Sequence, residues 1–272
     1  MIHIDHLKKS YDSFTLECSL DIPKGVITGI IGMNGAGKST LFKSILGINP
    51  IDEGTIQIPS KQDIGVVLSE TGFSEFFTVS DIISILKCTY KHFDEDLFHS
   101  YCQRFDIPLD KKTRTFSTGM KAKLNIIIAL THHAQLLILD EPTAGLDVLT
   151  RDEILDILRD YMEKEDCTIL ISSHISSDLE SLCDDLYIID HGQIIMHEEM
   201  DTLLSQYGVL KVSKEDYDNL DKDYLLEVMK EPFGYSCLTN ERQYYIENYP
   251  TIVIEQNHID TMIPVLLKGE RL

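Results

Sequence analysis

The sequence lacks the features that mark membrane-embedded, secreted and disulfide-stabilised chains. No apolar run among its 272 residues approaches the roughly 18 residues that a membrane-spanning helix needs. The opening stretch from Met1 to His6 contains no apolar run of signal-peptide length. Six cysteines are scattered without a CxxC pair, and a chain of this size does not depend on disulfide staples. We therefore expect reduced thiols and a cytoplasmic protein.

Basic residues are scarce, with 24 lysines and arginines against 45 aspartates and glutamates and a formal net charge of −21. A free nucleic-acid binder usually carries a basic patch that neutralises phosphates, and anionic lipids attract basic segments in the same way. We therefore expect no nucleic-acid partner, and we expect any association with a membrane to run through another protein. The hydrophobic content of 43% is enough for one sizeable core.

Strands and helices are expected to alternate along most of the chain. The sequence predicts early strands at Ile2–Leu7, Phe14–Ile22 and Val26–Ile31, a helix at Lys38–Leu46, and short strands at 54–58 and 64–68. After residue 136 it predicts strands at 136–140, 168–172 and 186–190, separated by helices at about 149–164 and 176–183. Such alternation is typical of an α/β fold with a largely parallel sheet covered on both faces.

Two segments depart from this alternation. Between about 72 and 130 the apolar residues follow helical spacing, which predicts an inserted helical subdomain. Beyond about 205 the pattern changes again, with expected strands at Gly208–Ser213 and Thr251–Gln256 and a helix at Ile259–Leu267. We expect a main domain over 1–205 and a small α+β accessory region over 206–272.

A glycine-rich loop follows the third expected strand and fits G-x-x-x-x-G-K-[ST], the Walker A pattern. Its glycines let backbone N–H groups surround phosphate, and the helix that follows adds a positive partial charge. We expect Lys38 to reach the β- and γ-phosphates and Ser39 to help hold Mg²⁺. The alternative is a glycine-rich turn without a ligand, which the strand–helix context disfavours. The residues expected to contact nucleotide are Gly32, Asn34, Gly35, Ala36, Gly37, Lys38, Ser39 and Thr40.

A second motif is an apolar strand that ends in two carboxylates, Asp140 and Glu141. The first is placed to hold Mg²⁺, directly or through water, and the second to polarise an attacking water molecule. Taken alone, the same pattern also fits a buried strand with two exposed acids at its end.

The order of these motifs resembles the ABC ATPase family, in which a signature segment lies between the phosphate loop and the Asp-Glu strand. The signature-like segment here is Phe116–Met120, which departs from Leu-Ser-Gly-Gly-Gln at three positions but keeps Ser117 and Gly119. The resemblance implies that Ser117, Gly119 and Met120 contact the γ-phosphate of ATP held by the other subunit. The alternative is an ordinary helix start.

Two further segments resemble parts of the same family. Ala144–Asp147 resembles the loop that contacts the second subunit, and Asp147 also fits a plain helix N-cap. His174 follows the expected strand at 168–172 and resembles the switch histidine, which bonds the γ-phosphate and orients the site.

The resemblance assigns two other positions with weaker local support. Tyr11 lies upstream of the phosphate loop, where the family carries an aromatic residue that stacks on adenine; an exposed loop tyrosine is the alternative. Ser69 stands where the family usually has glutamine, and its hydroxyl could bind Mg²⁺ or water. Glu70 could substitute for Ser69 if the register slips.

The resemblance covers about residues 2–200 and implies a P-loop NTPase (ABC ATPase) core with an antiparallel β subdomain and the inserted helical subdomain. The small C-terminal α+β appendix lies outside the resemblance and is expected from the sequence pattern alone. It implies an ATP-hydrolysing subunit that binds ATP and Mg²⁺, pairs with a second ATPase subunit in a homo- or heterodimer, and drives a separate membrane-spanning permease. The chain looks like the stand-alone subunits of bacterial ABC-2-like exporters, peripheral on the inner face of the membrane. The helical block near 72–105 would contact the permease, with Phe73, Phe76 and Phe77 as candidate contacts or simple core residues.

Three other function classes compete with this interpretation. The first is a P-loop enzyme of another class, such as a GTPase or a small-molecule kinase. A GTPase would show Asn-Lys-x-Asp for guanine, and the chain has no such motif. An ABC protein acting on DNA or ribosomes would carry long coiled-coil insertions or two ATPase domains, whereas this chain has one phosphate loop and no heptad run. A regulatory or immunity module that binds ATP without pumping stays open.

Overall fold

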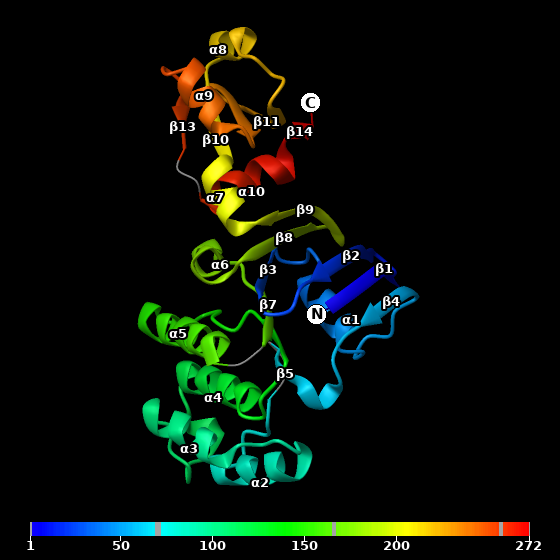
Figure 1. The fold of residues 1–272 in the computed structure, drawn as a ribbon, viewed down its shortest axis with the longest axis vertical. Helices are drawn as coiled ribbons and strands as arrows, with labels where there is room; N and C mark the ends of the chain where they lie inside the picture. The colour runs from blue at the N-terminus through cyan, green and yellow to red at the C-terminus, as the bar shows by residue number, and fades with distance from the viewer. Residues whose placement is uncertain (1, 69–71, 165–166, 256–257, 272) are drawn as a thin grey trace. The chain divides into compact units, whose positions relative to one another are not determined.

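The computed structural model describes residues 2–68, 72–164, 167–255 and 258–271 (Figure 1). The chain forms two compact units. The first comprises residues 1–174 and 187–196, and the second comprises 175–186 and 197–272. Within the described residues, no helix is both long and apolar enough to cross a membrane.

A six-stranded sheet in the order β5-β6-β7-β3-β8-β9 has most of its residues in the first unit. Its strands are β3 (Ile27–Ile31), β5 (Ile64–Val67), β6 (Leu136–Asp140), β7 (Thr168–Ser172), β8 (Asp185–Asp190) and β9 (Gln193–Glu199). β5, β6, β7 and β3 are parallel neighbours. Every residue of β3, β6 and β7 is buried, which explains their continuous apolar sequences. The predicted α/β class is confirmed.

A second, antiparallel sheet has the order β2-β1-β4, with β1 at Ile2–Tyr11, β2 at Phe14–Ile22 and β4 at Glu53–Gln57. Alternate residues of β2 are buried, as expected for a half-buried strand. The inner face packs with α1 (Lys38–Ile45) in one core that contains Leu16, Leu41 and Phe42. Figure 1 shows this blue sheet beside α1, the helix that begins within the phosphate loop at Lys38.

Four helices follow in the first unit: α2 (Val79–Thr89), α3 (Glu95–Arg104), α4 (Thr118–Leu130) and α5 (Val148–Lys164). Two short 3₁₀ turns lie at Lys61–Asp63 and Thr113–Thr115. Side-chain caps fix the helix starts: Thr78 and Asp81 form a capping box on α2, and Asp94 caps α3. Polar residues just before apolar runs therefore set the boundaries of the inserted helical block.

The second unit contains α6 (Ser176–Leu182), α7 (Met200–Gln206) and a five-stranded sheet in the order β13-β10-β12-β11-β14. The strands are β10 (Gly208–Val212), β11 (Leu225–Glu231), β12 (Gly234–Thr239), β13 (Val253–Ile254) and β14 (Glu270–Arg271). Three further helices of this unit are α8 (Lys214–Asn219), α9 (Arg242–Asn248) and α10 (Ile259–Lys268). β13 is shorter than the strand predicted at Thr251–Gln256, because residues 249–252 form a turn closed by Ile252 N–H donating to Tyr249.

Candidate active site

The phosphate loop joins the end of β3 to the start of α1. Gly37 precedes Lys38 with a φ of 117°, a left-handed value that favours glycine. A Cβ on Gly37 would lie 2.9 Å from the Phe14 ring, and a Cβ on Gly32 would collide with the backbone oxygen of Ile189. Packing and backbone geometry thus both require glycine here, and the loop is held against β2 and β8.

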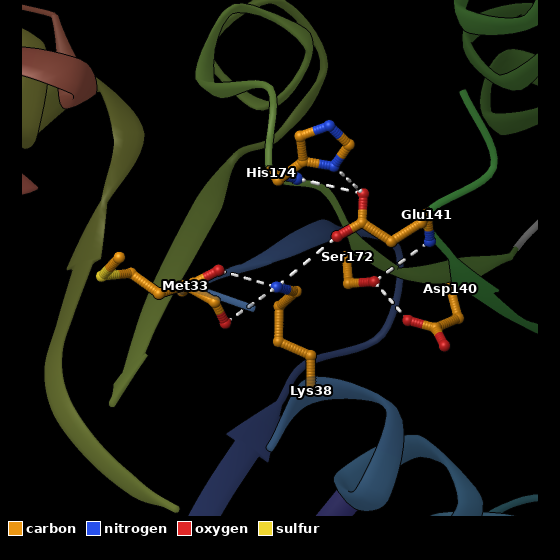
Figure 2. Close-up of polar contacts among 7 residues, drawn as sticks. Met33, Lys38, Asp140, Glu141, Ser172 and His174 are labelled. Carbon is orange, nitrogen blue, oxygen red and sulfur yellow. Dashed lines mark hydrogen bonds and ion pairs between the residues drawn. The ribbon is translucent and has the colours of Figure 1, made fainter. Parts of the chain in front are cut away.

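Lys38 points back into this loop (Figure 2). Its Nζ donates to the backbone oxygen of Gly32 at 2.7 Å and to that of Met33 at 3.5 Å. The same Nζ lies 3.5 Å from Glu141 Oε1. The lysine side chain is only 7% exposed, so its charge is directed into the site rather than into bulk water.

Asp140 ends β6 directly beside Ser172, which ends β7. The Ser172 hydroxyl donates to Asp140 Oδ1 at 2.7 Å, and the buried Oδ2 has no hydrogen-bond partner. A buried, half-satisfied carboxylate suits a cation. The described residues contain no group of three or more His, Cys, Asp or Glu side chains that could hold a metal alone. Any metal here would take most of its ligands from phosphate and water, as Mg²⁺ commonly does.

Glu141 turns sharply out of the strand, with a φ of 54°. Its backbone N–H donates both to the backbone oxygen and to the hydroxyl of Ser172, each at 3.1 Å. Its Oε2 accepts from His174 Nδ1 at 2.6 Å and from His174 N–H at 3.1 Å. Figure 2 shows the carboxylate between Lys38 and His174. The glutamate is thus oriented by cationic or donor groups on both sides.

A cavity of about 550 Å³ opens over these groups, within the usual range for small-molecule sites. It brings together the phosphate loop, Glu141 and His174. Two lining residues, Phe14 and Ala144, come from other segments. The predicted residues that line it are Asn34, Gly35, Gly37, Lys38, Ser39, Thr40, Glu141 and His174. Gly32, Ala36 and Asp140 are buried beneath that surface.

Tyr11 does not line this cavity. Its hydroxyl accepts from Asn49 Nδ2 at 3.0 Å, Lys9 Nζ lies 5.6 Å from its ring centre, and the residue is 46% exposed. Phe14 lines the cavity instead, and sequence reasoning missed it. The available signal was a second aromatic residue at the start of β2, a few positions after Tyr11. Ser172 was also missed, because a serine at a strand end carries no signal until its neighbour Asp140 is known.

The signature-like segment and Asp147 lie outside the cavity lining. Ser117 is exposed and caps α4, accepting from Met120 N–H at 3.2 Å, while Gly119 and Met120 are half-buried in its first turn. Asp147 is exposed and accepts from Thr150 N–H at 3.0 Å. Its two hydrogen bonds from Thr150, the backbone one first, hold the pKa of Asp147 below its usual value. Ser69 and Glu70 lie outside the described residues.

Comparison with known proteins agrees with this geometry. The ABC transporter family model matches residues 16–144. An ABC transporter ATP-binding protein of Bacillus subtilis, YtrB, is 31% identical over 231 residues, which cover 81% of this chain and 79% of the relative. The lantibiotic transport ATP-binding protein SrtF of Streptococcus pyogenes is 34% identical over 212 residues, 74% of this chain and 92% of the relative.

Solved structures show the same fold. An ATP-binding subunit of an ABC transporter superposes with a TM-score of 0.68 at 25% identity, covering 76% of this chain and 92% of that one. A dimeric ATP-binding cassette solved with ADP and phosphate gives a TM-score of 0.66 at 19% identity, covering 74% and 99%. The chain therefore belongs to the ATP-binding proteins of ABC transporters, and it is an ATPase of that family.

Proposed function

We propose that this chain is the motor subunit of an ABC exporter, which pairs with a second ATPase subunit and drives a separate membrane-spanning permease. The observation that carries the proposal is the meeting of Lys38, Glu141 and His174 around one cavity. This trio supplies a cation for phosphate, a carboxylate for water and a side chain that orients the carboxylate. The partner subunit is identical or different, and no nucleic acid takes part.

Lys38 and the loop amides would hold the β- and γ-phosphates in the cavity. The phosphates would replace Glu141 as the partner of Lys38 Nζ, which leaves the carboxylate free to face water. Ser39 and the unpartnered Asp140 Oδ2 fit a role in holding Mg²⁺. Mg²⁺, when bound, would neutralise charge that develops on the phosphate oxygens.

Hydrolysis needs water oxygen to bond to the γ-phosphorus while the bond from that phosphorus to the bridging oxygen breaks. The bridging oxygen leaves with the electron pair as part of ADP. Glu141 would accept the proton from the water, and His174 would keep the Glu141 carboxylate aimed through its 2.6 Å contact. His174 is half-exposed, so it can also turn toward the γ-phosphate.

The second subunit enters the proposal because Ser117 and Gly119, which the resemblance assigns to nucleotide contact, do not line the cavity of their own chain. Both lie at the exposed N-terminus of α4, where backbone N–H groups attract phosphate. A second subunit could offer this helix start to the bound ATP. A cassette of the same fold that was solved as a dimer with ADP and phosphate supports pairing.

The permease would dock on the helical block. A second cavity of about 400 Å³ lies between β5, α2 and α4, with Phe73, Ile85 and Tyr90 among its lining residues. In the same block Phe76 is 66% exposed and Phe77 36%, so both rings are accessible to a partner. Export is favoured because the chain resembles ABC-2-like subunits, and one relative is a lantibiotic transport protein.

Light scattering with ATP tests the pairing. Glu141→Gln keeps the size of the side chain but loses the base, so hydrolysis should fall by about 10²–10⁴-fold while binding survives. The variant should accumulate as an ATP-bound dimer, whereas wild type with ADP should be mainly monomeric. Adding Ser117→Arg should block closure by bulk and charge.

The matched control is Ser80→Arg in the same Glu141→Gln background, at another exposed helix start. It should leave the dimer intact. A Ser117→Arg protein that dimerises as well as this control would remove Ser117 from the shared site. A Glu141→Gln protein that stays monomeric, alone and with its permease, would contradict the pairing itself.

A further inference from the structure

Thr150, on the first turn of α5, touches both of the exposed segments that the proposed dimer would use. Its hydroxyl donates to Asp147 Oδ2 at 2.9 Å, and its backbone N–H donates to Asp147 Oδ1 at 3.0 Å. On its other side, its methyl carbon Cγ2 would lie 3.1 Å from a Cβ placed on Gly119. The side chain therefore has a polar end on Asp147 and an apolar end on Gly119.

This contact explains, from within the chain itself, why position 119 is a glycine. The backbone of Gly119 is not in the left-handed region, so its φ does not require glycine. A Cβ there would meet Thr150 Cγ2 at 3.1 Å and Oγ1 at 3.3 Å, which is tighter than ordinary van der Waals contact. A larger residue would push the first turn of α4 away from α5 or displace Thr150 from Asp147.

An ion pair also joins α4 and α5, between Lys123 on α4 and Glu153 on α5. A second pair holds α5 to a different helix: Arg104 at the end of α3 donates to Asp160 on α5 at 3.0 Å. These pairs lie at partly exposed positions and contribute modestly. The Thr150 contact lies at the end of the α4–α5 pair that is next to Ser117 and Asp147. Unlike the ion pairs, it is a close packing contact, between the Thr150 methyl group and Gly119.

We propose that Thr150 is a positioning residue that fixes the spacing between the Ser117–Gly119 segment and Asp147, so that both meet the second subunit together. The proposal rests on the proposed function, because it assigns these two segments to one interface. Gly119 then has two separate candidate roles. Its missing side chain leaves room for Thr150 within the chain, or it lets the nucleotide held by the second subunit approach closely.

A suppressor pair distinguishes the two roles. In the Glu141→Gln background, Gly119→Ala should weaken ATP-dependent dimerisation, with about a tenfold rise in the dimer dissociation constant. Adding Thr150→Ser removes the methyl group but keeps the hydroxyl for Asp147, and it should restore most of the dimerisation. Thr150→Val keeps the methyl group and loses the hydroxyl, so it should restore nothing and weaken the dimer by itself.

The matched control is Thr55→Ser, the same chemical change at an exposed site on β4. It should leave the Gly119→Ala defect unchanged. ATP binding to the monomer should be equal in all variants, because Thr150 does not line the cavity. A Gly119→Ala defect that Thr150→Ser does not relieve would overturn the proposal and assign the glycine to nucleotide approach.

A double-mutant cycle on the monomer keeps the test independent of pairing. The unfolding free energies of Gly119→Ala, Thr150→Ser and the double variant should be non-additive, since the two residues are in contact. Additive values would contradict the positioning role. A Glu141→Gln protein that never dimerises would count against the proposed function, while the cycle would still decide whether Thr150 fixes the position of Gly119.

Discussion

One buried hydroxyl organises the two carboxylates of the site. Ser172 donates to Asp140 and accepts from the N–H of Glu141, so both acids depend on the end of β7. Asp140, Glu141 and His174 could be singled out from the sequence because their order along the chain matches a family pattern. Ser172 could not, because its role arises only from the register that pairs it with Asp140.

Two aromatic residues near the N-terminus, Tyr11 and Phe14, are alternative candidates for stacking on the nucleotide base. The resemblance assigns stacking to Tyr11, whereas Phe14 lines the cavity and contacts the phosphate loop at Gly37. We expect Phe14→Ala to raise the KM for ATP by about tenfold, as the loss of one base–aromatic contact would. Tyr11→Ala should change the KM much less, because its hydroxyl and ring are engaged by Asn49 and Lys9.

Steady-state ATPase assays over a range of ATP concentrations measure this difference. Phe14→Tyr is the conservative control and should keep a KM near that of wild type. A larger effect of Tyr11→Ala than of Phe14→Ala would return the stacking role to Tyr11 and leave Phe14 as a packing residue.

At the scale of elements, uninterrupted apolar strands were the easiest to predict. β2, β6 and β7 have the predicted bounds, because their burial follows directly from their sequences. β1 was predicted to end at Leu7 but continues to Tyr11. His6 has a φ of 48° at a register shift, and this bulge breaks the alternation on which the prediction depended.

His132 joins three elements and should make the helical block sensitive to acid. Its buried ring stacks on Tyr90 after α2 with ring centres 4.0 Å apart, and Nε2 donates to the backbone oxygen of Ile64 at 3.2 Å. Burial lowers the pKa of His132 below 6.5. Its contribution to stability is therefore complete above pH 6.5 and is lost as the pH falls through the folded-state pKa.

We expect His132→Phe to remove this part of the pH dependence, because phenylalanine keeps the stacking and cannot be protonated. The unfolding free energy of wild type relative to this variant should fall with acid by at most about 1.4 kcal/mol per pH unit for one proton. Urea unfolding at several pH values measures it. Parallel curves for the two proteins would show that His132 titrates normally in the folded state.

At the scale of the whole molecule, the second unit was the least predictable part. β11, β12 and α9 carry no clear periodicity, and only Leu225 and Val228 of β11 are buried. A register shift between Leu225 and Glu227 displaces the alternation within that strand. The sequence also gives no sign that α6, which comes long before the appendix, belongs to the same compact unit.

Truncation at the predicted boundary should therefore damage more than the appendix. Ending the chain after residue 205 would remove α10, whose first residue donates its N–H to Glu180 on α6 at 2.6 Å. Leu179, Leu182 and Leu203 are buried in the full chain, and those that lie against the removed residues would become exposed. We expect the shortened protein to unfold several degrees lower, by about 2–4 °C for each 1 kcal/mol lost, and to aggregate.

Differential scanning fluorimetry on both lengths, with Phe233→Ser in the full chain as a surface control, measures the effect. Phe233 is 96% exposed, so its replacement should leave the midpoint unchanged. A truncated protein that is as stable and soluble as the full chain would show that residues 1–205 fold without the appendix.

The left-handed backbone at Glu141 sets activity against stability at a single position. A non-glycine residue with a φ of 54° stores strain of about 1–2 kcal/mol, and here two hydrogen bonds to Ser172 hold it in place. Glycine would relax that strain while removing the base, although its extra freedom in the unfolded chain offsets part of the gain. Selection for thermal stability alone would therefore favour replacement of Glu141 and loss of ATP hydrolysis. Only selection for catalytic turnover keeps the carboxylate at this position.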